Sequence, residues 1–173
     1  MRDAKLEQAM VALQPKLRRF AYGLSGSPDT ANELVQCTYE RALTRLDQWQ
    51  PGTRLDSWMY RILQSIWLNQ IRAGKVRGAH LDPIEPDTQG CEMPARRLEA
   101  GMMLETVQRC MWQLPEEQRA ALMLVAVEGL SYKEASAVLD VPVGTLTSRL
   151  ARARMALSEL MGDRDAVTQR EVG

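Results

Sequence analysis

Residues 131–157 constrain the fold most strongly, because they predict two short helices joined by a tight turn. Ser131 and Glu134 have the spacing of a capping box, in which two residues satisfy each other's backbone N–H groups at a helix start. The letters LDVP at 139–142 end this helix, since a helix interior does not accommodate proline. A second helix is predicted from Val143 to roughly Leu160, with an inner face made of Leu146, Leu150, Ala153 and Leu157.

The outer face of this second helix carries basic and hydroxyl side chains. A short helix, a tight turn and an amphipathic basic helix form the helix-turn-helix pattern, whose second helix enters the major groove of DNA. Arginine can bond guanine through two hydrogen bonds, and serine or threonine can bond a base or a phosphate. The alternative is a helical bundle with a solvated basic face. The residues expected to contact DNA are Thr145, Ser148, Arg149, Arg152 and Arg154.

The rest of the chain also predicts helices and no strands. Only 5% of the residues are aromatic, so the cores must consist mostly of Leu, Val, Ala and Met, which favours helices. Apolar residues recur at helical spacing from Leu6 to Leu24, where Pro15 is expected to kink the helix or split it in two. Further helices are predicted at 30–46 with Asp29 as N-cap, at 55–73, from Leu98 onwards, and at 116–128.

The predicted helix at 55–73 has two distinct faces. One is an apolar stripe expected to lie in the core, and the other is basic and rich in hydrogen-bonding groups. The apolar stripe consists of Leu55, Trp58, Met59, Ile62, Leu63 and Ile66. The basic strip consists of Arg61, Ser65, Asn69 and Arg72. Trp67 belongs to neither face.

Charge divides the chain into segments although the 22 basic and 22 acidic residues balance overall. Residues 1–80 carry 12 basic and 7 acidic side chains, whereas residues 81–117 carry 3 basic and 8 acidic ones. The first segment suggests an anion-binding module, and the proline-rich acidic stretch after it predicts a flexible linker between mobile domains. We therefore expect an all-α protein with a first domain at 1–78, a linker at 79–100, a second domain at 101–165 and a tail at 166–173. The second domain is expected to be a helix-turn-helix, winged-helix-like but without strands.

Several kinds of site are missing from the sequence. The three cysteines have no C-x-x-C spacing and His80 is the single histidine, so neither a zinc site nor a disulfide framework is indicated. There is no phosphate-binding loop, no Ser–His pairing and no metal-type carboxylate cluster. We expect no catalytic residue, no metal, no cofactor and no enzymatic activity. The absence of a signal core and of a run near ~18 apolar residues predicts a cytoplasmic protein without a membrane segment.

Two parts of the sequence resemble one known family. The letters LPEEQRAALMLVAVEGLSYKEASAVLDVPVGTLTSRLARARMAL resemble the second DNA-binding domain of bacterial extracytoplasmic-function sigma factors, group 4 of the sigma-70 family. The letters LSGSPDTANELVQCTYERAL and RLDQWQPGTRLDSWMYRILQSIWLNQIR resemble the first domain of that family. The resemblance implies a protein that binds core RNA polymerase at the clamp helices and the flap of its large subunits. It also implies recognition of the −35 and −10 elements of promoter DNA, duplex opening, and regulation by an anti-sigma factor.

The resemblance also assigns roles to residues of the first domain. The predicted helix at 30–46 resembles the segment that docks on the clamp helices, although Cys37 replaces a residue that is usually polar. Its matching residues are Asn32, Glu33, Gln36 and Arg41. The loop at 45–54 resembles the one that captures a base flipped from the −10 element, which requires stacking and hydrogen bonds. The loop residues expected to bind this base are Gln48, Trp49, Gln50 and Thr53.

Other residues of the first domain would complete the −10 contact. Ser65, where the family often has Asn, and Asn69 are expected to line the pocket for the flipped base. Trp49 has an alternative place as a loop residue tucked on the core. The residues expected to hold DNA phosphates are Arg54, Arg61, Arg72, Lys75 and Arg77.

Two other functions stay open at the level of sequence. An ordinary helix-turn-helix regulator would account for residues 114–157, but not for the helix at 30–46 or the loop with Trp49. A sigma-like decoy that only binds an anti-sigma factor should lose the basic face of the last helix. Arg149, Arg152 and Arg154 retain that face, which favours a sigma factor.

Overall fold

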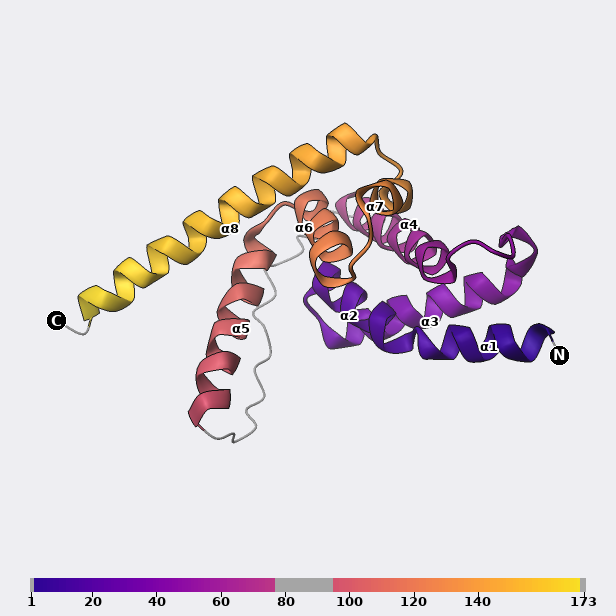
Figure 1. Ribbon diagram of the computed structural model, residues 1–173, viewed down its shortest axis with the longest axis horizontal. Helices are drawn as coiled ribbons and strands as arrows, with labels where there is room; N and C mark the ends of the chain where they lie inside the picture. The colour runs from indigo at the N-terminus through magenta and orange to yellow at the C-terminus, as the bar shows by residue number, and fades with distance from the viewer. Residues whose placement is uncertain (1, 77–94, 172–173) are drawn as a thin grey trace.

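The computed structural model describes residues 2–76 and 95–171, with the side chains of residues 5–74 and 103–162. Residues 79–94 of the linker expected at 79–100, Arg77 and the side chain of Lys75 lie outside this part of the chain. Within it every regular element is a helix, as the sequence predicts (Figure 1). The first domain consists of α1 (Arg2–Ala12), α2 (Gln14–Ser25), α3 (Pro28–Thr44), a short 3-10 helix (Leu46–Gln48) and α4 (Leu55–Val76).

Local sequence signals set the helix ends in the first domain. Pro15 lies in the first turn of α2, where its missing N–H costs nothing, and the predicted N-terminal helix is split there into α1 and α2. Gly26 ends α2 in the left-handed region, with φ of 68°. The prediction that Asp29 caps α3 is wrong. Ser27 is the cap, because its hydroxyl accepts the N–H of Thr30 at 3.3 Å, and Asp29 lies inside the first turn.

The first-domain core lies where α2, α3 and α4 meet. Phe20 is fully buried and meets the ring of Tyr60 edge-on, with centroids 5.2 Å apart and planes at 75°. Four members of the predicted stripe on α4 are buried, but Leu55 and Trp58 are only half-buried. Tyr60 and Trp67, which lie outside that stripe, are buried as well. The added burial arises because a second layer of helices covers another side of α4.

This second layer is the second domain. It consists of α5 (Ala95–Gln113), α6 (Glu116–Leu122) with a π-helical continuation (Met123–Val127), α7 (Tyr132–Leu139) and α8 (Val143–Glu171). The helix α5 begins within the range expected to be linker, and α8 continues beyond the expected boundary at 165. The π-helical continuation ends at Val127, and Gly129, which follows Glu128, has a φ of 71°. The helix-turn-helix consists of α7, the turn that follows it and α8.

The helix-turn-helix has the local features that its sequence predicts. The capping box at the start of α7 is present, with the Ser131 hydroxyl accepting the Glu134 N–H and the Glu134 carboxylate accepting the Ser131 N–H. Asp140 ends α7 in the left-handed region, with φ of 52°. The inner face of α8 is buried at Leu146, Leu150 and Ala153. These residues pack α8 on α6 and α7.

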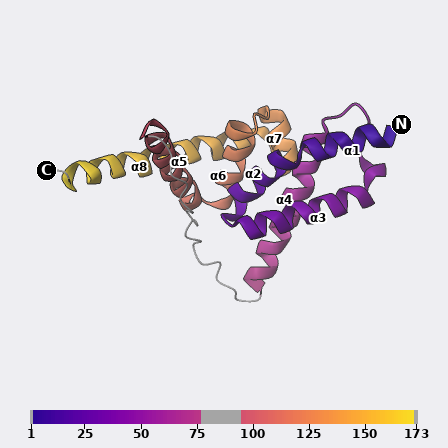
Figure 2. The same cartoon turned by 90° about the horizontal axis from the view of Figure 1, so that it is seen from below.

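The two domains are packed against each other. Figures 1 and 2 show α7 lying on α4 and α6 lying beside α2. The domains approach closely at Gly23 of α2, where an added Cβ would overlap the side chain of Met123. The proline-rich linker favours mobile domains. In this structure, however, the two domains are in contact. The contact buries part of the first domain's polar face.

Candidate nucleic-acid interface

A cleft of about 540 Å³ gathers most of the first-domain residues expected to bind DNA. The loop between the 3-10 helix and α4 forms one wall, and the first two turns of α4 form the floor. The opposite wall comes from α7 of the second domain. The lining residues are Gln48, Trp49, Gln50, Thr53, Arg54, Ser57, Trp58, Arg61, Glu134, Ala137 and Val138.

Contacts of Trp49 and its neighbours order the loop that forms one wall of the cleft. The Thr53 hydroxyl donates to the Gln50 carbonyl at 2.7 Å, which closes the turn around Pro51 and Gly52. Trp49 is half-buried and also faces a second hollow, between the loop and α1. Its indole N–H is buried without an acceptor among the residues that the structure describes. The ring therefore has one part packed on protein and one part facing the cleft.

Arg54 is the most strongly paired side chain of the cleft. Its guanidinium donates to both oxygens of Asp56, at 3.0 and 2.6 Å, and to the Glu134 carboxylate at 2.9 Å. The hydrogen bonds that Arg54 donates to Asp56 raise the pKa of Arg54. Burial alone would raise the pKa of Asp56, but hydrogen bonds from Arg54 and from the Ser57 N–H hold it below its usual value. Arg54 is therefore a fixed cation.

Arg61 and the other residues of the basic strip share one exposed face of α4. The guanidinium of Arg61 donates to the Ala137 carbonyl at 2.8 and 3.2 Å, near the end of α7. Ser65 returns its hydroxyl hydrogen to the Ile62 carbonyl, so its oxygen keeps free acceptor capacity. Asn69 and Arg72 are exposed on the following turns. The strip continues away from the cleft toward the end of α4.

The residues of α8 expected to bind DNA differ in exposure. Ser148, Arg152 and Arg154 are exposed, and Thr145 is half-buried. Arg149 does not point outward as its place in the sequence suggests. Only 18% of its side chain is exposed, because its guanidinium is turned toward Glu117 of α6, with an N–O distance of 2.8 Å. Arg149 therefore joins α8 to α6.

The residues expected to bind the polymerase lie on α3, away from the cleft. Asn32, Glu33 and Gln36 are exposed, and Arg41 is half-buried. Gln36 donates to Glu40 at 3.1 Å along the same helix face. A shallow hollow of about 360 Å³ lies beside them, and the exposed apolar residue Leu43 is on its rim. This surface of α3 therefore contains both polar and apolar groups.

The described residues contain no cluster of three or more His, Cys, Asp or Glu side chains that could hold a metal ion. Over the same residues, no helix has both the length and the apolar character needed to cross a membrane.

Comparison with known proteins places both domains in one family. Residues 11–64 match the family described as the Sigma2 domain of PhyR, and residues 104–157 match Sigma-70, region 4. The chain is 36% identical over 156 residues to the ECF RNA polymerase sigma factor EcfG of Rhodopseudomonas palustris, covering 90% of this chain and 84% of that protein. This chain belongs to the ECF RNA polymerase sigma factors. The family resemblance seen in the sequence is thereby confirmed.

Solved structures resemble this sigma factor over most of its length. One is the sigma factor RpoE in complex with the anti-sigma factor NepR from Bartonella quintana, with 30% identity and a TM-score of 0.74. The similarity covers 91% of this chain and 97% of that one. The anti-anti-sigma factor PhyR complexed with NepR, from the same organism, shares the fold at 17% identity and a TM-score of 0.59.

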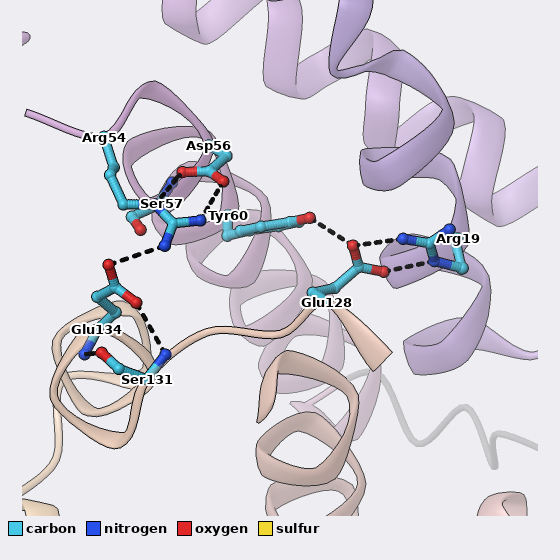
Figure 3. A network of polar contacts seen from close by, with 8 residues as sticks. All are labelled: Arg19, Arg54, Asp56, Ser57, Tyr60, Glu128, Ser131 and Glu134. Carbon is cyan, nitrogen blue, oxygen red and sulfur yellow. Dashed lines mark hydrogen bonds and ion pairs between the residues drawn. The ribbon is translucent and has the colours of Figure 1, made fainter. Parts of the chain in front are cut away.

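Sequence reasoning missed several polar residues that join the two domains of the sigma factor. The Glu128 carboxylate is fully buried and accepts two hydrogen bonds from Arg19, at 2.7 and 2.8 Å, and one from the Tyr60 hydroxyl at 2.7 Å (Figure 3). The sequence indicates a role for Glu134 only in the capping box with Ser131. No local signal could identify these pairs, since 109 positions separate Arg19 from Glu128 and 80 separate Arg54 from Glu134.

Proposed function

We propose that this sigma factor binds core RNA polymerase through α3 and directs initiation at promoters that it reads with two surfaces. The −35 element is contacted by the exposed face of α8, and the −10 element by the loop and the basic strip of α4. The observation that carries the proposal is the cleft that brings an aromatic ring, amide side chains and two arginines together. Stacking, hydrogen bonding and phosphate binding are the three interactions that a flipped base on a separated strand requires.

Each group of the cleft has a part in this proposal. Trp49 stacks on the captured base, and Gln48, Gln50 and Thr53 offer hydrogen bonds to its edge. Arg54, Arg61 and Arg72 hold phosphates and set the register of the strand without reading its sequence. Because Thr53 and Gln50 already bond each other, the loop is partly organised before DNA arrives. Less conformational entropy is then lost on binding.

For the second domain we predict that Arg149→Ala weakens binding to the −35 element by ~1–3 kcal/mol and relaxes base preference at one position. The side chain lies early in α8, and turning away from Glu117 would bring it to the exposed face beside Ser148 and Arg152. Footprinting of the −35 region measures the effect, with Arg109→Ala as a control of equal charge change on α5. A footprint identical to that of the unmodified protein would assign Arg149 a structural role only.

For polymerase binding we predict that the double substitution Glu33→Ala and Gln36→Ala weakens the complex with core polymerase at least about tenfold, or ~1.4 kcal/mol. Both side chains are exposed on α3, and Gln36 lines the hollow there. Fluorescence titration of labelled protein with core polymerase measures the constant. The matched control is Glu7→Ala, an exposed acid on α1. Equal affinities for the two variants would move the docking surface away from this part of α3.

A decoy for an anti-sigma factor is a second candidate, because the first domain matches the Sigma2 domain of PhyR. A decoy needs the surfaces that an anti-sigma factor covers, but it does not need a DNA-binding face. Arg152 and Arg154 are exposed on α8, and Arg72 is exposed on α4. These free cations favour a protein that binds DNA.

An anti-sigma factor is also proposed as a partner of this chain. The solved RpoE relative is bound to the anti-sigma factor NepR, and this chain covers nearly all of that structure at 30% identity. An anti-sigma factor of the same type would control when the polymerase acquires this subunit, and both proteins would meet in the cytoplasm.

A further inference from the structure

The Arg54 guanidinium is held on one side by Asp56. Its Nε and Nη2 atoms donate to the two oxygens of that carboxylate, at 3.0 and 2.6 Å, which is the two-point geometry of a planar guanidinium with a carboxylate. The third nitrogen, Nη1, is directed to the other side and donates across the cleft to Glu134 at 2.9 Å (Figure 3). The pair with Asp56 therefore fixes which nitrogen of Arg54 faces the cleft.

Asp56 is itself held in place at the start of α4. Its carboxylate accepts the Ser57 N–H at 2.8 Å, in addition to the two hydrogen bonds from Arg54. The side chain of Asp56 is 13% exposed, compared with 47% for Arg54. Burial raises the pKa of Asp56, but these hydrogen bonds hold it below its usual value, so the carboxylate is ionised at neutral pH. An ionised carboxylate with three donors is a rigid support for the guanidinium.

Asp56 supports the cleft without lining it. Arg54, Ser57 and Glu134 line the cleft, whereas Asp56 is not one of the lining residues. A phosphate in the cleft would meet the Nη1 side of the Arg54 guanidinium, with the Asp56 carboxylate on the other side. The positive charge of Arg54 would therefore lie between the phosphate and the negative charge of Asp56.

The Asp56 carboxylate has two opposing effects on the binding of a DNA phosphate. It repels the phosphate, but water and salt screen this repulsion at the exposed side of Arg54. It also restricts the rotamers of a long side chain before DNA arrives, so that less conformational entropy is lost on binding. Salt screens a partly buried ion pair less than it screens charges that are farther apart and exposed. We therefore expect the orienting effect to be larger than the repulsion.

We propose that Asp56 is a positioning residue, which orients Arg54 so that Nη1 meets a phosphate of the separated DNA strand. The inference rests on the proposed function of Arg54 in holding phosphates, and it adds to that function a residue that does not itself touch DNA. An acid beside a DNA-binding surface then strengthens DNA binding, which is the opposite of what its charge alone predicts. The effect requires a guanidinium, because the ammonium of lysine is a point charge on a flexible stem without a planar fork.

The test compares Asp56→Asn in two backgrounds of equal charge, the unchanged Arg54 and Arg54→Lys. All proteins carry Glu134→Gln, which removes the acid that Nη1 meets here and leaves an amide oxygen to accept the Ser131 N–H. Fluorescence anisotropy measures the affinity for a fluorescein-labelled single strand of mixed sequence, since phosphate contacts carry no sequence information. We expect Asp56→Asn to weaken binding about threefold to tenfold with Arg54 unchanged. In the Arg54→Lys background it should leave the affinity unchanged or raise it slightly.

Two controls separate positioning from folding and from charge. The amide oxygen of Asp56→Asn can still accept the Ser57 N–H, and any remaining effect on the start of α4 is the same in both backgrounds. Circular dichroism should show equal helix content for all of these proteins. Asp47→Asn removes one acid from the exposed side of the 3-10 helix and should leave DNA affinity unchanged or raise it slightly.

Arg54→Ala in the same Glu134→Gln protein separates the positioning role from the proposed function. If it weakens DNA binding while Asp56→Asn has the same effect in both backgrounds, the positioning role is wrong and the phosphate contact of Arg54 survives. If Arg54→Ala leaves DNA affinity unchanged, the proposed function of Arg54 is wrong, and the positioning role of Asp56 with it. A loss of affinity for Asp47→Asn as large as that for Asp56→Asn would also overturn the proposal.

Discussion

Replacing Phe20 by alanine is expected to lower the free energy of unfolding by about 4 kcal/mol. The ring is fully buried where α2, α3 and α4 meet, and its edge-on contact with Tyr60 stabilises the fold beyond the effect of the buried area. The loss combines the removed apolar surface with the cavity that remains, since close-packed helices relax only partly. Urea titration followed by circular dichroism at 222 nm, the ordinary helix band, measures it.

The position of Phe20 makes this result informative about both domains. Phe20 lies under Tyr60, and the Tyr60 hydroxyl holds Glu128 of the second domain. Loosening the core should therefore also weaken the contact between domains. Val11→Ala is the control, because Val11 is an exposed apolar residue on α1 and should change stability by less than about 0.5 kcal/mol. Equal midpoints for the two variants would contradict the packing described for α2.

Replacing Arg119 by alanine is expected to cost about 3 kcal/mol, the second largest effect. Its guanidinium donates to the carbonyls of Trp112 and Leu114 at the end of α5 and to that of Leu24 at the end of α2. Helix ends leave their last carbonyls without partners, and Arg119 satisfies three of them from two domains. Burial lowers the pKa of Arg119, with Glu116 opposing the shift. Without this side chain, the three carbonyls lose a charged donor in a partly buried place.

Arg109 provides the control for Arg119. It is exposed on α5 and carries the same charge, so Arg109→Ala should leave the urea midpoint nearly unchanged. A lower midpoint for Arg119→Ala alone supports the capping role. If both substitutions lower the midpoint equally, the effect comes from net charge, and the hydrogen bonds to the helix ends contribute little.

The sequence predicts most of the individual helices because their signals are local. The break at Pro15, the capping box at Ser131 and Glu134, and the apolar stripe of α8 each depend on residues within a few turns. Competition between local signals explains why Asp29 is wrongly predicted to cap α3. Two residues there can cap a helix, and Pro28 fits the first helical position only if Ser27 is the cap.

Contacts between the domains could not be predicted in the same way. The burial of Tyr60 and Trp67 depends on helices from the second domain, which no periodicity within α4 can indicate. The prediction that Arg149 points outward failed because it considers one helix alone, whereas Glu117 of α6 draws the guanidinium back. The family resemblance implies the roles of the −10 residues. The structure shows that α7 lines the same cleft as the loop residues among them.

Transcription with purified components tests the central claim most directly. The sigma factor is mixed with bacterial core RNA polymerase and fragmented host DNA, and the 5′ ends of the transcripts are sequenced. We predict new start sites that share two motifs at a fixed separation, which polymerase alone does not use. The absence of such starts, together with a failure to bind polymerase in gel filtration, would contradict the assignment of this chain as a promoter-directing subunit.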